Sequence, residues 1–179
     1  TYQIPRPFDH LSVIDNVAVP AMFGAAQLGR AAARLDAMRW LDFTGLADKA
    51  QWLPGDLNLH QRKFLELARA LASRPRLLLL DEHTAALDPR TADQVIQLSS
   101  EIVARDRLTT LMVTHSMQQA ARVSQRTAFF HLGKLIEEGR TEDIFSNPRH
   151  KQTEAYITGK IDRLDVAYND WWGESLGAM

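Results

Sequence analysis

The feature that most constrains the fold is a run of four leucines, Leu77–Leu80, which ends in two adjacent carboxylates, Asp81 and Glu82. The run is short and follows Pro75, which favours a β-strand over a helix. Because an apolar run without alternation is typical of a parallel strand covered on both faces, we expect a buried strand in a parallel sheet. Ligands bind at the carboxyl ends of such strands, so both carboxylates are predicted to face a binding crevice. The structural alternative is a strand that ends in solvated charges.

Helical and extended patterns alternate on both sides of this strand. The segment 61–72 has the spacing of a helix, with Lys63, Glu66 and Arg69 away from its apolar face. The other expected elements are a short amphipathic element over 11–19, helices over 25–46, 92–104, 117–123, 141–145 and 151–157, and strands over 109–114, 128–132 and 134–138. The pattern predicts an α/β fold with a largely parallel sheet, beside which the helical block before residue 75 forms a subdomain.

The composition bounds the kinds of function that the chain can have. A formal net charge of −1 gives no reason to expect a nucleic-acid partner. The absence of cysteine excludes disulfides and thiolate metal sites. No apolar run approaches the roughly 20 residues of a membrane helix, so a membrane role is expected to come through a partner. No targeting signal is visible, and the start at Thr1 suggests that the natural N-terminus lies elsewhere.

Further motifs lie before and after the leucine strand. In chain order the motifs are Gln3, Leu57-Asn58-Leu59-His60-Gln61, Leu77–Asp81 with Glu82, Ala86-Leu87-Asp88 and His115. In this order they resemble the glutamine loop, the signature, the Walker B strand with its catalytic-type glutamate, the D-loop and the switch histidine of the ABC transporter ATPase family. The resemblance covers residues 1–160 and implies a P-loop NTPase-like ABC ATPase domain.

This resemblance implies ATP and Mg²⁺ as ligands and gives several residues a role. Asp81 and Gln3 are implied to hold the Mg²⁺, and Gln3 also reports the nucleotide state to the membrane subunits. Glu82 and His115 are the implied catalytic residues. Glu82 polarises the water that attacks the γ-phosphate, and His115 hydrogen-bonds that phosphate. The structural alternative for His115 is a histidine that only ends its strand.

The signature is implied to bind the ATP held by an opposite subunit. Asn58, His60 and Gln61 lie at a predicted helix N-terminus, where free N–H groups attract a phosphate. Asp88 is implied to contact the opposite subunit, and it can also cap the helix that begins near Arg90. The family signature reads Leu-Ser-Gly-Gly-Gln, so the bulk of His60 in place of a glycine is expected to weaken turnover.

The phosphate-binding loop of the family is not found in this sequence. Such a loop reads G-x-x-x-x-G-K-[ST], and neither Gly133-Lys134 nor Gly159-Lys160 has the required neighbours. In the family this loop precedes the glutamine loop, so we expect a domain truncated at its N-terminus that lacks the Walker A segment. The expected parts are a helical subdomain over 10–74, a catalytic-core portion over 75–160 and a tail of unknown role over 161–179. In the tail, Trp171-Trp172 is expected either to pack on its own domain or to form an interaction site.

The implied function is ATP hydrolysis that powers solute uptake through separate membrane subunits. The implied partners are permease subunits, a second ATPase subunit in a homodimer or heterodimer and, indirectly, a solute-binding protein. The implied location is the cytoplasmic face of the cell membrane. The stretches 114–124 and 151–159 are similar to phosphate importer ATPases and favour phosphate as the solute. The stretch 3–17 is similar to ATPases of branched-chain amino-acid importers, which are the alternative.

Two other classes of function stay open. The chain can be a non-catalytic interaction module that docks on a transporter or a partner ATPase with its signature face. A soluble ABC protein of translation or DNA repair is the third class, but those proteins usually carry a second ATPase domain or a coiled-coil insertion. An in-frame phosphate-binding loop in the upstream coding sequence would favour the enzyme over the interaction module.

We predict that the purified 179-residue chain has no measurable ATPase activity. The reason is that the backbone N–H groups and the lysine of a phosphate-binding loop are not present in it. Release of phosphate from ATP over time measures this. Steady hydrolysis at a rate typical of an intact subunit would contradict the prediction.

Overall fold

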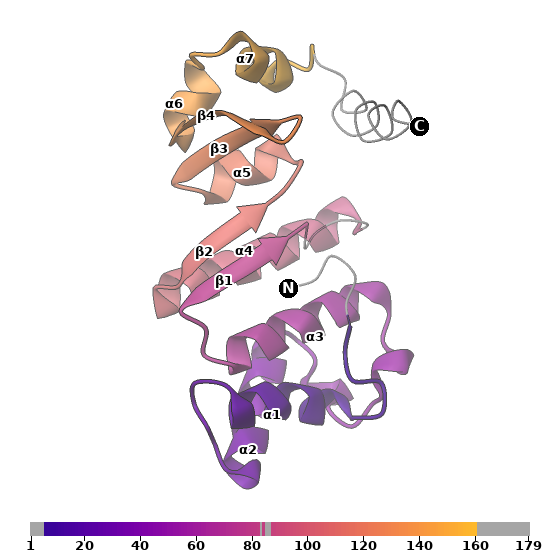
Figure 1. Cartoon of the computed structure of the whole chain (residues 1–179). Helices are drawn as coiled ribbons and strands as arrows, with labels where there is room; N and C mark the ends of the chain where they lie inside the picture. Colours follow the sequence, from indigo (N-terminus) through magenta and orange to yellow (C-terminus); the bar gives the residue numbers. More distant parts are fainter. Residues whose placement is uncertain (1–5, 83, 85–86, 161–179) are drawn as a thin grey trace, which may run out of the picture. The chain divides into compact units, whose positions relative to one another are not determined.

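The computed structural model describes residues 6–82, 84 and 87–160 (Figure 1). Gln3 and the tail with Trp171-Trp172 therefore lie outside the described residues. The chain divides into two compact units, Thr1–His115 and Ser116–Met179. The boundary predicted at residue 75 falls within the first unit and stays a prediction. No helix in the described ranges is long and apolar enough to cross a membrane.

The first unit begins with a block of packed helices. The elements are α1 (Val13–Phe23), α2 (Arg30–Phe43), the 3-10 turns η1 (Ala47–Lys49) and η2 (Pro54–Asp56), and α3 (Leu59–Ala72). Helix α1 packs against both α2 and α3. Their apolar side chains form one core, in which Val17, Leu41 and Leu65 are fully buried. Burial of these side chains is the main source of the block's stability.

A buried asparagine ties the chain before α1 to that helix. The side chain of Asn16 is fully buried. Its Oδ1 accepts from the Phe8 N–H at 2.8 Å, and its Nδ2 donates to the Phe8 and Leu11 carbonyls at 3.0 Å and the Ser12 carbonyl at 3.1 Å. The amide thus pairs backbone groups that would otherwise be buried without a partner.

Two parallel strands and a long helix complete the described part of this unit. Strand β1 (Leu77–Asp81) pairs with β2 (Thr109–Val113), with Leu77 opposite Thr109 and Asp81 opposite Val113. Helix α4 (Pro89–Asp106) connects them and lies alongside both strands (Figure 1). A parallel connection of this kind needs a crossover helix, which the sequence between the strands supplies.

The expectation that the leucine strand is covered on both faces is wrong for the described structure. Leu78 and Leu80 are 2% exposed and belong to the core that includes Ile102 of α4. Leu77 and Leu79 are 57% and 46% exposed. Successive side chains of a strand point to opposite faces, and in the described part of this unit helices cover one of these faces.

The helices of this unit also differ from those expected. Helix α2 spans 30–43 rather than 25–46, because Gly29 caps its start and Gly45, with φ +70°, follows its end. Helix α3 begins two residues earlier than expected, because Asn58 is its N-cap. Lys63 and Glu66 are buried rather than solvated. Buried residues lie all around most of α3, so the helix has less polar surface than its spacing predicts.

The second unit is a hairpin with short helices. It contains α5 (Met117–Val123), β3 (Arg126–His131), β4 (Lys134–Arg140), α6 (Thr141–Ser146) and α7 (Lys151–Ile157). Strands β3 and β4 are antiparallel, and Gly133 has φ +72° in the turn between them. The carboxylate of Glu137 accepts the backbone N–H groups of Arg149 and His150 at 2.8 and 3.2 Å, which holds the chain that leads into α7.

We expect Asn16→Ala to lower the free energy of unfolding by about 2–3 kcal/mol, because it leaves buried backbone groups unpaired. The matched control is Gln97→Ala, which removes an exposed amide that bonds Glu101 at 3.0 Å and should cost less than about 0.5 kcal/mol. Urea denaturation followed by circular dichroism compares the two variants. Equal losses would show that the Asn16 hydrogen bonds do not hold the first helix in place.

Candidate functional site

The carboxyl ends of β1 and β2 carry the acidic residues that the sequence singled out. Asp81 is the last residue of β1 and lies opposite Val113. Glu82 adds one more backbone hydrogen bond to the ladder between β1 and β2, because its N–H donates to the Val113 carbonyl at 3.0 Å. Its φ of +44° is left-handed, a conformation that costs a non-glycine residue on the order of 1 kcal/mol. This turn ends the strand and directs the Glu82 side chain toward the end of β2.

Glu82 and His115 are brought into direct contact. The backbone N–H of His115 donates to Glu82 Oε1 at 2.9 Å, and the ring Nδ1 lies 2.7 Å from Glu82 Oε2. The Glu82 side chain is 19% exposed, whereas that of His115 is 61% exposed. Both carboxylate oxygens are therefore engaged, while the histidine ring stays open to solvent. The two predicted catalytic residues form one unit at the edge of the sheet.

Lys63 belongs to the electrostatics of this edge, although sequence analysis placed it on the polar face of its helix. It is 7% exposed on α3. Burial lowers the pKa of its ammonium group, and the nearby carboxylates of Glu82 and Asp81 act in the opposite direction. A buried cation thus lies within electrostatic reach of both acidic residues. Only the packing of α3 against the sheet shows this, because the helical spacing alone gives no sign of it.

The same edge can be tested for its fit to Mg²⁺. No group of three or more His, Cys, Asp or Glu side chains suited to a metal is found among the described residues. Magnesium, however, usually binds proteins through one or two carboxylates and keeps water and phosphate oxygens as its other ligands. Asp81 supplies a carboxylate of this kind, so the donor set fits. The proposed second ligand, Gln3, lies outside the described residues.

The signature residues form the capped start of α3. The Gln61 N–H donates to Asn58 Oδ1 at 2.9 Å, and the Asn58 N–H donates to Gln61 Oε1 at 3.0 Å. Arg62 closes the preceding turn through the Leu57 and Gly55 carbonyls, at 3.0 and 3.1 Å. Side chains of the chain itself therefore satisfy N–H groups that a phosphate would otherwise bind at this helix end.

His60 lies within the first turn of α3 and packs on a neighbouring ring. Its imidazole is edge-on to Phe64, with ring centroids 4.6 Å apart. Its Nε2 is buried and has no hydrogen-bond partner among the described residues. Burial lowers the pKa of His60, and the charge of Asp88 partly opposes this. The residue that replaces the family glycine is thus held by packing.

Asp88 caps the helix that follows the site. Its Oδ1 accepts the Thr91 N–H at 3.1 Å, and α4 begins at Pro89. A hydrogen bond with the Thr91 side chain lowers the pKa of Asp88 most, and the bond from the Thr91 backbone N–H adds to this effect. The capping role expected as an alternative is confirmed, whereas a contact with an opposite subunit stays a prediction.

Comparison with known proteins identifies the fold and the family. Over 166 residues the chain is 39% identical to the phosphate import ATP-binding protein PstB of Pyrococcus furiosus, covering 89% of this chain and 64% of that protein. A dimeric ATP-binding cassette, MJ0796, solved in a post-hydrolysis state with ADP and phosphate, superposes with a TM-score of 0.70 at 27% identity, covering 78% of this chain and 61% of that one. The chain belongs to the ABC ATPase family. An ABC transporter in an inward-facing conformation gives a TM-score of 0.71 at 26% identity, covering 86% of this chain and 60% of that one.

These ABC relatives are longer than the chain. It spans a little under two thirds of the length of PstB and of each ABC structure that it matches. No protein-family model matches it. The fold expected from the sequence, an ABC ATPase α/β domain, is confirmed by these comparisons. The individual roles of the site residues remain predictions.

The lowered pKa of His60 predicts how stability depends on pH. A histidine whose pKa is lower in the folded state than its ordinary 6.5 contributes stability above that pH and loses it as the pH falls. We therefore expect unfolding to become easier between about pH 7.5 and about pH 5.5, and His60→Phe to reduce this dependence while keeping the ring on Phe64. Urea denaturation at the two pH values measures it, with His10→Phe at an exposed site as the control. An unchanged pH dependence in His60→Phe would contradict the prediction.

Proposed function

We propose that the chain is part of the ATP-hydrolysing subunit of an ABC importer and that the imported solute is phosphate. The observation that carries the proposal is the contact of Glu82 with His115 at the carboxyl end of the parallel strands. The similarity to PstB, which is named as a phosphate import protein, supports the choice of solute. The partners in this proposal are permease subunits, a second ATPase subunit and, indirectly, a solute-binding protein. The subunit would lie at the cytoplasmic face of the membrane.

In this proposal Glu82 orients the attacking water. Water attacks the γ-phosphorus of ATP, the bond to the bridging oxygen of ADP breaks, and the Glu82 carboxylate accepts the proton that the water loses, which gives ADP and phosphate. In the described structure both oxygens of Glu82 already accept from His115. One of these bonds must open for a water to bind, and the exposed ring of His115 would then hydrogen-bond the γ-phosphate.

Asp81 and the cation of Lys63 complete the proposed site. Mg²⁺, when bound, would neutralise charge on the β- and γ-phosphates, and Asp81 is the residue proposed to hold it, with Gln3. The buried ammonium of Lys63 lowers the electrostatic cost of having Asp81 and Glu82 adjacent and charged. Asn58, His60, Gln61 and Asp88 would serve the nucleotide of the opposite subunit.

A second candidate function is a non-catalytic module that contributes protein contacts alone. The observation that favours it is that the side chains of the signature residues contact each other and their own helix. Asn58 and Gln61 cap each other, and the His60 ring packs where the family has a glycine. A phosphate would have to displace the Asn58 side chain to reach the Gln61 N–H of α3. The two functions differ in whether ATP turns over once a phosphate-binding loop is present.

To test the enzyme, the chain is joined behind the phosphate-binding segment of the Pyrococcus relative, and Glu82→Gln is introduced. We expect hydrolysis to fall by at least about 100-fold while ATP binding is retained, because the amide keeps the shape but not the basicity of the carboxylate. Phosphate release and binding of a fluorescent ATP analogue measure the two properties.

The matched control is Glu101→Gln, an exposed change on α4 that leaves the site intact. Turnover that survives Glu82→Gln would contradict the assignment of Glu82. A fused protein that binds ATP without hydrolysing it, with or without Glu82, would favour the non-catalytic module.

A further inference from the structure

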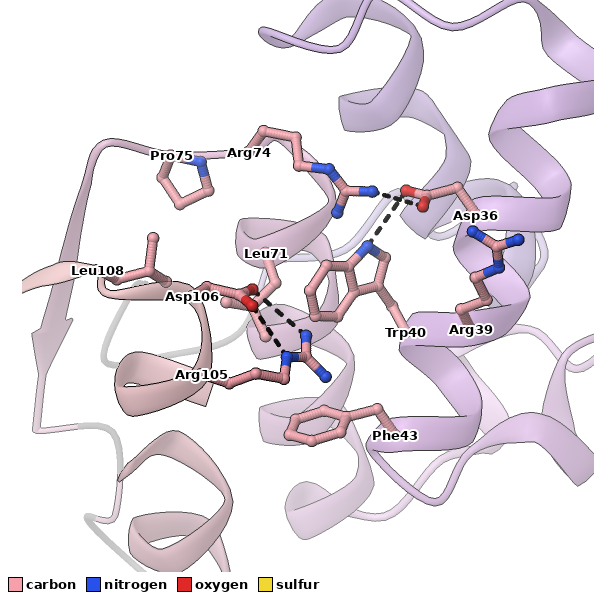
Figure 2. Close-up of a pocket in the computed structure, with 10 residues that line it drawn as sticks. All are labelled: Asp36, Arg39, Trp40, Phe43, Leu71, Arg74, Pro75, Arg105, Asp106 and Leu108. Atoms are coloured by element: carbon pink, nitrogen blue, oxygen red, sulfur yellow. Dashed lines mark hydrogen bonds and ion pairs between the residues drawn. The ribbon is translucent and has the colours of Figure 1, made fainter. Parts of the chain in front are cut away.

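A pocket of about 540 Å³ lies in the first unit, away from the site described above (Figure 2). Its walls come from the second half of α2, the turn from α3 into β1, and the turn from α4 into β2. It therefore lies at the amino ends of the parallel strands, whereas Glu82 and His115 lie at their carboxyl ends. The four residue steps of β1 separate the two ends by roughly 13 Å. None of the predicted site residues lines this pocket.

One side of the pocket is built around Asp36, as Figure 2 shows. Trp40 Nε1 donates to Asp36 Oδ2 at 3.2 Å, and the Arg74 guanidinium donates to Asp36 Oδ1 at 2.6 Å. The Asp36 side chain is only 8% exposed, so this charge is held by its partners rather than by water. The same arginine lies over the Trp40 ring, 5.1 Å from its centroid. Asp36 thus fixes the position of one guanidinium at the pocket wall.

A second guanidinium is fixed in the same way on the other side. Arg105 donates to both carboxylate oxygens of Asp106, at 2.9 and 3.3 Å. It also lies 5.6 Å from the Trp40 centroid and 5.4 Å from that of Phe43. More than half of its side chain is exposed, so the remaining donors are accessible to solvent. A guanidinium has five N–H donors, so an arginine that uses two of them on a carboxylate can still bind an oxyanion with the others.

The third arginine gives the pocket an excess of positive charge. Arg39 lines the wall, and its side chain forms no ion pair or hydrogen bond with any other described residue. Three arginines therefore face two aspartates, which leaves one positive charge uncompensated. Since both aspartates are already paired, an added anion would meet guanidinium groups first.

The remaining wall is apolar. Phe43, Leu71, Pro75 and Leu108 line it beside the charged groups. A volume of about 540 Å³ is within the range of small-molecule sites and exceeds what a bare phosphate ion fills. The combination fits a ligand with one anionic group and a small apolar body.

The backbone at Arg74, which directly follows the C-cap of α3, sets the position of its guanidinium. Its φ of +55° is left-handed, where glycine or asparagine is the favoured residue. Holding an arginine there costs on the order of 1 kcal/mol, and such outliers gather at ligand sites. The conformation places the guanidinium on both Asp36 and Trp40 at the edge of the pocket.

We propose that this pocket binds a small organic anion, with its carboxylate or phosphate group held by the positive charge of the arginines that line the pocket and its apolar body against Phe43 and Leu108. The ligand is distinct from the nucleotide of the proposed function, and the pocket does not depend on that function. A site at the amino ends of β1 and β2 can be occupied while the carboxyl ends hold ATP.

Binding is measured on the full 179-residue chain by isothermal titration, with phenyl phosphate, phenylacetate and inorganic phosphate as separate probes. Nuclear magnetic resonance of the Trp40 indole N–H, assigned with Trp40→Phe, reports whether a probe enters this pocket. We expect saturable binding of phenyl phosphate or phenylacetate that shifts the Trp40 signal and weakens as salt is raised. Inorganic phosphate, which has no apolar body, should bind more weakly. A preference between the two aromatic probes identifies the anionic group.

The decisive variant is Arg39→Gln. Because the Arg39 side chain bonds no other described residue, the variant should keep its thermal stability but weaken probe binding about tenfold. Arg30→Gln, an exposed change at the start of the same helix, is the matched control and should leave binding unchanged. The proposal is overturned if neither aromatic probe binds, if Arg39→Gln binds as well as the original chain, or if inorganic phosphate binds as tightly as phenyl phosphate.

Discussion

The parallel pairing of β1 with β2 is the constraint on which the rest of the first unit depends. The register places Asp81 opposite Val113, and one more bond, from the Glu82 N–H to the Val113 carbonyl, closes the ladder. That bond brings Glu82 to the end of β2, where His115 follows two residues later. A slip of one residue would turn the leucines that now fill the core outward and would separate Glu82 from His115. Core packing and the candidate site are therefore fixed by the same hydrogen bonds.

Helix α3 connects this sheet to the helical block and contributes to the site at two places. Its N-terminus carries the residues of the degenerate signature, and one turn later the buried Lys63 comes within electrostatic reach of Asp81 and Glu82. The helix can begin with asparagine, leucine and histidine because Asn58 and Gln61 cap each other. A glycine at position 60 would free the backbone but lose the ring contact with Phe64 and part of the helix propensity. At position 60, histidine therefore favours the stability of the helix, whereas glycine would favour the approach of a phosphate.

Sequence analysis predicted what depends on local pattern. The leucine strand is confirmed residue for residue, and so are the helices over 117–123 and 151–157, because apolar runs and periodicity set them. The order of motifs was enough to expect Glu82 and His115 in one site. It could not show that they bond directly, since the two residues lie far apart in the chain. Lys63 was misplaced for a related reason, because a helical pattern shows one apolar face and α3 is buried on more than one.

No local sequence pattern could predict the arginine pocket, because its walls come from three segments that only the fold brings together. Backbone strain links it to the candidate site. Arg74, Glu82 and Arg107 are three of the described non-glycine residues with a left-handed backbone, and they lie before β1, after β1 and before β2. Each costs on the order of 1 kcal/mol, which burial of Leu78 and Leu80 in the core can offset. For Arg74 and Glu82 the unusual turn sends a charged side chain to a defined partner, Asp36 or His115. Glycine would relax either turn, but it would leave Asp36 or His115 without the charged partner that the turn supplies.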